Sequence, residues 1–312
     1  MITGSLVPNI TLFDAKGGID FEKTRWHMEW MFSKGVDGLF LTGSYGAGPL
    51  MSNAERIEVF KLAKTAAAKF KNRILLPHVG CIDTVHTVEL ARAAEKLGVD
   101  AIGVVPPFYY KHSDDVVIAY YKEILEAVKI PVFAYNNPET SRYTFNLKVI
   151  RKLQGMGLAG MKDSPLQVGF LSRVAYEAEV AKSGFQVIIG TSTGWLPFFH
   201  MGVRATIAGM NNWAPEIMTE LVRATFAGEW DRAALAYVVM MDLNAAIKSL
   251  FSDSTIASHA ALYARGFDAG FPRKPMLLPP SDNPGYDAVK SAMEKAFARL
   301  DLPFTTGDFK FR

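Results

Sequence analysis

Short apolar runs and longer amphipathic stretches alternate along this chain up to about residue 226. Each apolar run ends in Gly, Pro, Ser or Asn and is followed by apolar positions at helical spacing. The pattern predicts strands near 5–12, 38–42, 74–79, 101–105, 131–135, 158–162, 186–190 and 205–210. It predicts helices near 22–34, 52–70, 84–97, 114–128, 146–153, 167–182, 193–201 and 214–226. Such alternation favours a parallel α/β sheet.

Local signals and a weak internal repeat support these units. Ser52 and Glu55 form a capping-box pattern that opens a helix, and Gly98 is a typical helix stop. The segment 35–40 (GVDGLF) resembles 98–103 (GVDAIG), and 202–207 (GVRATI) is a looser third copy. Eight strand–helix units predict a (β/α)8 TIM barrel rather than a doubly wound sheet. No G-x-G-x-x-G follows the first strand, which also argues against a dinucleotide-binding fold.

Beyond residue 226 the pattern becomes purely helical. Helices are predicted near 229–251, 254–265 and 282–299. We therefore expect a catalytic barrel over 1–226 and a helical segment over 227–312 that packs on the barrel.

Composition narrows the class of protein. The 312 residues carry a net charge of +3 and no long basic run, so a nucleic-acid partner is not expected. The single cysteine, Cys81, allows no disulfide within the chain. No uninterrupted apolar stretch of membrane-spanning length occurs, and residues 1–12 lack the pattern of a secretory leader. These features predict a cytoplasmic enzyme without a membrane partner.

Lys162 is the most informative residue at the predicted mouth of the barrel. In this fold the active site lies at the carboxyl ends of the strands, and Lys162 ends the apolar run 158–161. A lysine in such a place loses water, which favours the neutral amine that imine chemistry requires. The alternative is a lysine that only pairs with a structural carboxylate such as Asp163.

Hydroxyl groups at neighbouring strand ends support the imine interpretation. Tyr109, Tyr135 and Ser44 follow three other predicted strands, and a relay of hydroxyls could move the protons of a carbinolamine. Taken singly, each tyrosine could equally be a packed ring with a satisfied hydroxyl.

Two glycine-containing loops are candidate anion sites. Residues 43–46 (GSYG) could receive a carboxylate on their backbone amides. Residues 190–194 (GTSTG) follow the seventh strand, where many barrels bind phosphate, although they could instead hold a hydroxylated tail or form a simple loop. The strand ends show no cluster of metal-binding residues, so no metal is expected, and Cys81 has no evident partner base.

Four motifs in order resemble one known family. Gly-Ser-x-Gly at 43–46, Pro-x-Tyr-Tyr at 107–110, Tyr-Asn-x-Pro at 135–138 and Gly-x-Lys-Asp-Ser at 160–164 are similar to those of the dihydrodipicolinate synthase/N-acetylneuraminate lyase family. The resemblance covers roughly residues 4–300. It implies a barrel with three C-terminal helices, commonly a homotetramer, and no cofactor.

The resemblance also implies roles for individual residues. Lys162 would form a Schiff base with pyruvate or a related 2-oxo acid, and Tyr135 would be the general acid/base. Other implied roles are carboxylate binding by Gly43, Ser44 and Tyr45, a contribution of Tyr109 to a neighbouring subunit's site, a lining role for Ile207, and a backbone carbonyl of Gly190 that faces the substrate. Asn137, Thr140 and Thr191 are further candidate substrate-binding residues.

Departures from the family pattern bear on the substrate. Thr140 stands where the synthases have an arginine for their second substrate, with Arg142 two residues later. Tyr45 replaces a second small hydroxyl residue, and Ala47 replaces a glutamate. We therefore expect a catabolic aldolase, dehydratase or hydratase-aldolase more than an enzyme of lysine biosynthesis. A dihydrodipicolinate synthase proper, a phosphosugar aldolase or isomerase, and a non-catalytic barrel that binds small acids remain alternatives.

Overall fold

Eight parallel strands form the centre of the computed structural model, which describes residues 1–310. The strands are β1 (Gly4–Val7), β2 (Gly38–Leu39), β3 (Ile74–Leu75), β4 (Ile102–Val104), β5 (Val132–Asn136), β6 (Gly160–Asp163), β7 (Gln186–Ile189) and β8 (Ala205–Ile207). They pair in the order β3-β2-β1-β8-β7-β6-β5-β4. A parallel bridge between His78 and Gly103 joins the two ends of this order. The predicted (β/α)8 barrel is confirmed.

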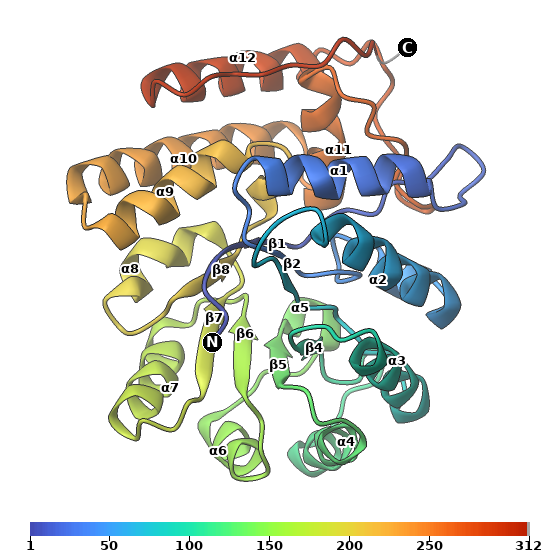
Figure 1. Ribbon diagram of the computed structural model, residues 1–312, viewed down its shortest axis with the longest axis vertical. Helices are drawn as coiled ribbons and strands as arrows, with labels where there is room; N and C mark the ends of the chain where they lie inside the picture. The colour runs from blue at the N-terminus through green and yellow to red at the C-terminus, as the bar shows by residue number, and fades with distance from the viewer. Residues whose placement is uncertain (311–312) are drawn as a thin grey trace.

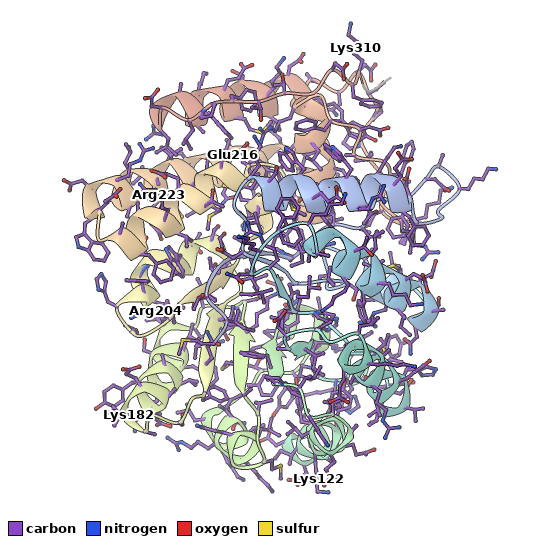
Figure 2. All side chains as sticks on the ribbon, viewed as in Figure 1. Lys122, Lys182, Arg204, Glu216, Arg223 and Lys310 are labelled. Carbon is purple, nitrogen blue, oxygen red and sulfur yellow. The ribbon has the colours of Figure 1, made fainter. Side chains whose placement is uncertain are left out.

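The helices lie around the strands, as Figure 1 shows. The outer helices are α1 (Phe21–Ser33), α2 (Asn53–Ala67), α3 (Thr84–Lys96), α4 (Asp114–Ala127), α6 (Leu147–Gly155), α7 (Val168–Val180), α8 (Trp195–Phe199) and α9 (Pro215–Ala227). Short helices follow four strands: η1 (Gly48–Leu50), α5 (Pro138–Ser141), η2 (Ser192–Gly194) and η3 (Gly209–Asn212). Exposed lysines such as Lys122 and Lys182 project from the outer rim (Figure 2).

Local helix signals act as the sequence predicted. The Ser52 hydroxyl accepts a hydrogen bond from the Glu55 N–H at 3.3 Å, and the Glu55 carboxylate accepts one from the Ser52 N–H at 2.8 Å. Gly98 adopts a left-handed φ of 66° directly after the C-cap of α3, a conformation that glycine adopts without a steric penalty.

Several predicted strands are shorter than expected. The first ends at Val7, not at 12, because a side chain takes over its pairing: the Ile10 N–H donates to Asn212 Oδ1, and Asn212 Nδ2 donates to the Pro8 carbonyl. The eighth ends at Ile207 because η3 begins at Gly209. The helix expected over 193–201 is split into η2 and α8.

Three further helices form the segment that follows the barrel: α10 (Trp230–Leu250), α11 (Ser254–Ala264) and α12 (Gly285–Arg299). One hydrophobic cluster includes residues of these helices, of α9 and of η3, so the segment packs on the β1 and β8 side. Whether 226/227 is a true domain boundary stays a prediction. By length and composition alone α10 could cross a membrane, but a helix packed in a protein core passes the same test, and α10 packs against α9 and α12.

Candidate active site

Lys162 lies inside the barrel on β6. The sheet pairs it with Tyr135 of β5 on one side and with Ile188 of β7 on the other. Only 3% of its surface is exposed. Its Nζ lies 3.8 Å from the ring centre of Phe40 and 3.9 Å from that of Tyr135. The amine is thus held between two aromatic faces, away from bulk water.

The pKa values of Lys162 and Tyr135 shift toward each other. Burial lowers the pKa of the Lys162 amine, and the charge and hydrogen bond of Tyr135 offset only part of that shift. Burial alone would raise the pKa of Tyr135, but the charge of Lys162 and hydrogen bonds with Ser164, Lys162 and Ser44 outweigh it, so the pKa of Tyr135 is lowered. A proton can therefore pass between these groups at lower cost than between free side chains in water.

Asp163 does not neutralise the lysine. Its carboxylate accepts hydrogen bonds from Asn136 Nδ2 at 2.6 Å and from the Leu166 N–H at 2.9 Å. Burial raises the pKa of Asp163, which those hydrogen bonds only partly offset. Within residues 1–310 no carboxylate lies within salt-bridge distance of Lys162. The alternative of a structural ion pair with Asp163 is therefore wrong.

Phe40 is a site residue that the motif analysis missed. Its ring lies against the Lys162 amine, meets the Tyr135 ring edge-on and packs at a tilt against His78. Two glycines leave room for it, because a Cβ on Gly43 would lie 2.8 Å from the ring and one on Gly103 would lie 2.6 Å from it. Alternation along the strand, with Leu39 and Leu41 in the outer core and Phe40 in the barrel interior, was the available signal.

The loop after β2 brings Ser44 to the Tyr135 hydroxyl and turns the Tyr45 hydroxyl toward α11. Ser44 hydrogen-bonds to the Tyr135 hydroxyl, so the predicted hydroxyl chain exists in part. Tyr45 instead hydrogen-bonds to Ser254 at the start of α11, and burial raises its pKa. Gly43 accepts a hydrogen bond from the Gly48 N–H, which closes the loop.

The loop after β5 contributes Asn137. Its Nδ2 donates to the Tyr135 hydroxyl at 3.1 Å, which makes it a partner of the acid/base candidate. Thr140 is exposed on α5, and its hydroxyl donates to the Asn137 carbonyl at 3.1 Å. The Thr140 hydroxyl thus bonds to the backbone of its own turn, and a direct role in substrate binding stays a prediction.

Tyr109 does not join the site within this chain. It is 69% exposed, has a φ of 82° and packs edge-on against Tyr110. The prediction that Tyr109 contributes to the active site of a neighbouring subunit stays a prediction.

The loop after β7 is bonded to the C-terminal helices. Gly190 is required because a Cβ there would lie 2.6 Å from Ser164 Oγ, and the Gly190 N–H donates to the Asp163 carbonyl at 2.6 Å. The Thr191 and Thr193 hydroxyls share a hydrogen bond. From α10, Asn244 donates to Ser192 Oγ at 3.1 Å and Tyr237 to the Thr193 carbonyl at 2.8 Å. These partners are neutral, unlike those expected of a phosphate site.

Other predicted residues behave as packing or polar core groups. Ile207 is fully buried in the interior cluster that also contains Phe40 and Tyr135. Burial raises the pKa of the Cys81 thiol, whose sulfur accepts a hydrogen bond from Arg56 at 3.2 Å. Among the described residues no group of three or more His, Cys, Asp or Glu side chains is placed to hold a metal ion. Ser164, to which the sequence analysis gave no role, belongs to the site because it hydrogen-bonds to the Tyr135 hydroxyl.

Comparisons with known proteins identify the family of this chain. The model of the Dihydrodipicolinate synthetase family matches residues 1–296. A 4-hydroxy-tetrahydrodipicolinate synthase of Bartonella quintana is 32% identical over 250 residues, which are 79% of this chain and 83% of that protein. A DapA-like lyase of Pyrococcus horikoshii, itself uncharacterized, is 29% identical over 93% of this chain and 98% of its own length.

Solved structures share the fold over nearly the whole chain. YagE, a prophage protein of E. coli K12 solved in complex with pyruvate, superimposes with a TM-score of 0.87 at 23% identity, covering 95% of this chain and 99% of YagE. KD(P)GA from T. tenax superimposes with a TM-score of 0.83 at 25% identity, and the match covers 96% of this chain and 100% of the KD(P)GA chain. The extent of the family match, together with a buried lysine paired with a tyrosine, shows that the chain is an enzyme of the dihydrodipicolinate synthetase family of Schiff-base lyases and aldolases.

Proposed function

We propose that the enzyme forms an imine between Lys162 and pyruvate or a related 2-oxo acid, and that it works as a catabolic aldolase, dehydratase or hydratase-aldolase. The observation that supports this most is the pairing of a buried, unneutralised amine with Tyr135. Burial favours the free amine as nucleophile, and the phenol beside it can exchange protons with the reacting groups.

The proposed sequence begins with carboxylate binding. The backbone amides of Ser44 and Tyr45 receive the substrate carboxylate, and Lys162 Nζ attacks the keto carbon. Tyr135 relays one amine proton to the former keto oxygen and then donates its own phenol proton, with Ser44 and Ser164 as hydroxyl partners, so that this oxygen leaves as water and Tyr135 is left as a phenolate. The product is a protonated imine.

The imine then accepts the electrons of the bond that breaks. In the cleavage direction the C3–C4 bond breaks, the C4 hydroxyl gives its proton to Tyr135, and an aldehyde leaves with an enamine remaining on Lys162. Protonation of the enamine at C3 and addition of water release the 2-oxo acid. In a dehydration, a C3 proton and a leaving hydroxide depart instead. The imine itself is the electron sink, so the mechanism requires no cofactor.

The residues around the pocket favour a catabolic enzyme over dihydrodipicolinate synthase proper. Thr140 replaces the arginine expected in the synthases, and its hydroxyl is engaged by Asn137. A phosphosugar aldolase is less favoured because the side chains that bond to the 190–194 loop are the neutral Asn244 and Tyr237. Competition by inorganic phosphate would point to that alternative.

We further propose a homotetramer in which Tyr109 reaches the site of a neighbouring subunit. Its side chain is 69% exposed and is therefore accessible to a neighbouring subunit. Light scattering of the purified protein would test the assembly, and Tyr109→Phe would test the contribution to catalysis.

Borohydride reduction tests the function directly. The enzyme is incubated with pyruvate and other 2-oxo acids, reduced, digested and mapped by mass spectrometry. We expect a stable adduct on the Lys162 peptide, and none in Lys162→Arg. Binding of a 2-oxo acid without an adduct at Lys162 would contradict the proposal and favour a non-catalytic barrel that binds small acids.

A further inference from the structure

Tyr45 occupies space on the β8 side of the barrel mouth. A Cβ on Gly209 would lie 2.3 Å from the Tyr45 hydroxyl oxygen and 2.5 Å from Cζ. Gly209 opens η3, only two residues after Ile207, which belongs to the interior cluster around Tyr135. The ring can therefore lie here only because position 209 has no side chain.

The C-terminal segment holds this ring in place. The Tyr45 hydroxyl hydrogen-bonds to the Ser254 side chain, and Asp253 is close enough to influence it electrostatically. The start of α11 is itself well fixed, because Asp253 Oδ1 accepts from the N–H groups of Thr255 at 2.8 Å and Ile256 at 2.9 Å. Tyr45 also packs against the apolar cluster that includes residues of η3 and α11. The ring is thus a fixed wall.

This wall stands beside the reacting groups. Tyr45 follows Ser44, which hydrogen-bonds to Tyr135, and Tyr45 lies within electrostatic range of Tyr135 as well. The side of the mouth formed by β5 to β7 has polar groups instead, with Asn137 and Ser164 on Tyr135 and the hydroxyls of Thr191 and Thr193 on the next loop. The β8 side of the mouth therefore carries a large fixed ring, whereas the β5 to β7 side carries polar groups.

We propose that Tyr45, held by Ser254 and admitted by Gly209, determines specificity: it excludes 2-oxo acids that branch at the carbon next to the keto group and directs an unbranched chain toward the polar side of the mouth. The inference rests on the proposed imine at Lys162 and deepens it by naming the shape of the substrate. One misplaced methyl group in a close-fitting pocket changes specificity by about 10- to 200-fold.

Two isomeric acids separate shape from size. We would measure borohydride trapping on Lys162 with 2-oxopentanoate, which is linear, and with 3-methyl-2-oxobutanoate, which branches at C3, using pyruvate as the acid without a tail. In the wild type we expect the linear acid to be trapped at least about tenfold faster. In Tyr45→Thr the preference should fall to about threefold or less, because the wall is removed. Ser254→Ala and Tyr45→Phe, which only free the ring, should give intermediate values.

Gly209→Ala tests the contact between position 209 and the Tyr45 ring independently. In the wild-type background the new Cβ must displace the Tyr45 ring, so both the preference for the linear acid and the melting temperature should fall. In the Tyr45→Thr background the same change should have little effect, and such non-additivity is the mark of direct contact. Gly169→Ala is the matched control, because a Cβ there would meet nothing within 4 Å.

The outcomes separate this inference from the proposed function. Absence of any adduct on wild-type Lys162, with pyruvate included, would contradict the imine and with it this inference. Trapping with a linear-to-branched ratio that is the same within twofold in wild type and Tyr45→Thr would overturn the role of Tyr45 alone. Trapping of pyruvate with refusal of both five-carbon acids by both proteins would overturn it too.

Discussion

Two buried basic side chains in this enzyme have different surroundings. Arg265 is 0% exposed and pairs with Glu216 at 3.1 Å, while its guanidinium also donates to the carbonyls of Trp213 and Thr305, each at 2.7 Å. Lys162 is 3% exposed and has aromatic faces and hydroxyls around it but no carboxylate partner within the described chain. Aromatic rings also flank Arg265, with Trp30 and Phe297 both 5.2 Å from its Cζ. The two side chains therefore differ in their polar partners: Arg265 has a carboxylate and two carbonyls, and Lys162 has neither among the described residues.

This comparison teaches how the fold separates stability from reactivity. A buried charge that is paired and hydrogen-bonded can serve as a structural anchor, here between the barrel, α11 and the chain near Thr305. A buried amine without a counter-ion is favoured in its neutral, nucleophilic form. Removal of each basic side chain should accordingly affect different properties of the enzyme.

Removal of the lysine should have the largest effect on catalysis. Lys162→Ala should lower kcat by at least about a thousandfold, roughly 4 kcal/mol, because no other group can form the imine. Its unfolding midpoint in urea should stay close to that of the wild type or rise, because the uncompensated buried amine is gone. A large loss of stability in this variant would contradict the comparison.

Removal of the arginine should affect stability instead. Arg265→Leu should lower the free energy of unfolding by about 3–5 kcal/mol, because two carbonyls lose their donor and Glu216 keeps only its longer pair with Lys34, at 3.5 Å. Urea titration followed by fluorescence would measure the loss. At temperatures where the variant is still folded, its rate of borohydride trapping on Lys162 should remain within severalfold of the wild-type rate. A thousandfold loss of trapping in the folded variant would argue against the separation.

Tyr135→Phe should slow turnover by about a hundredfold, because the phenol that relays protons is lost while the ring face over the amine remains. The charge and hydrogen bond of Tyr135 raise the pKa of Lys162, so their loss should lower that pKa further. The neutral amine then forms at lower pH, and the acidic limb of the trapping rate should move to lower pH. A limb that moves to higher pH would show that the phenol acts in another way.

Ser164→Ala should have the smallest effect. Its hydrogen bond helps lower the pKa of Tyr135, so the pKa of the phenol should rise in the variant. Loss of one hydrogen bond costs about 1 kcal/mol, which corresponds to roughly a fivefold loss of rate. Steady-state kinetics would measure it, with Ser249→Ala as the control on an exposed helix position. Equal effects of the two changes would remove Ser164 from the site.

The barrel, and the positions of Lys162 and Tyr135 at its strand ends, could be predicted from the sequence because both depend on local regularities. Apolar runs that end in turn residues located the strands, and the end of one run located Lys162. The sequence did not predict Phe40, whose role comes from the missing Cβ atoms of Gly43 and Gly103, or the bond between Tyr45 and Ser254, which joins positions far apart in the chain. It also gave no sign that the Thr140 hydroxyl bonds to the Asn137 carbonyl, and the predicted role of Thr140 at the substrate stays a prediction. Contacts of this kind depend on tertiary packing, which periodicity does not encode.

A direct titration of the Lys162 side chain tests the central claim. The ¹³Cε resonance of Lys162, assigned through Lys162→Arg, would be followed with pH in the folded, substrate-free enzyme. We predict a midpoint below the ordinary lysine value of 10.5, because burial lowers the pKa of this amine and no carboxylate restores it. A midpoint at or above 10.5 would contradict the account, since the amine would then be held as a cation like Arg265.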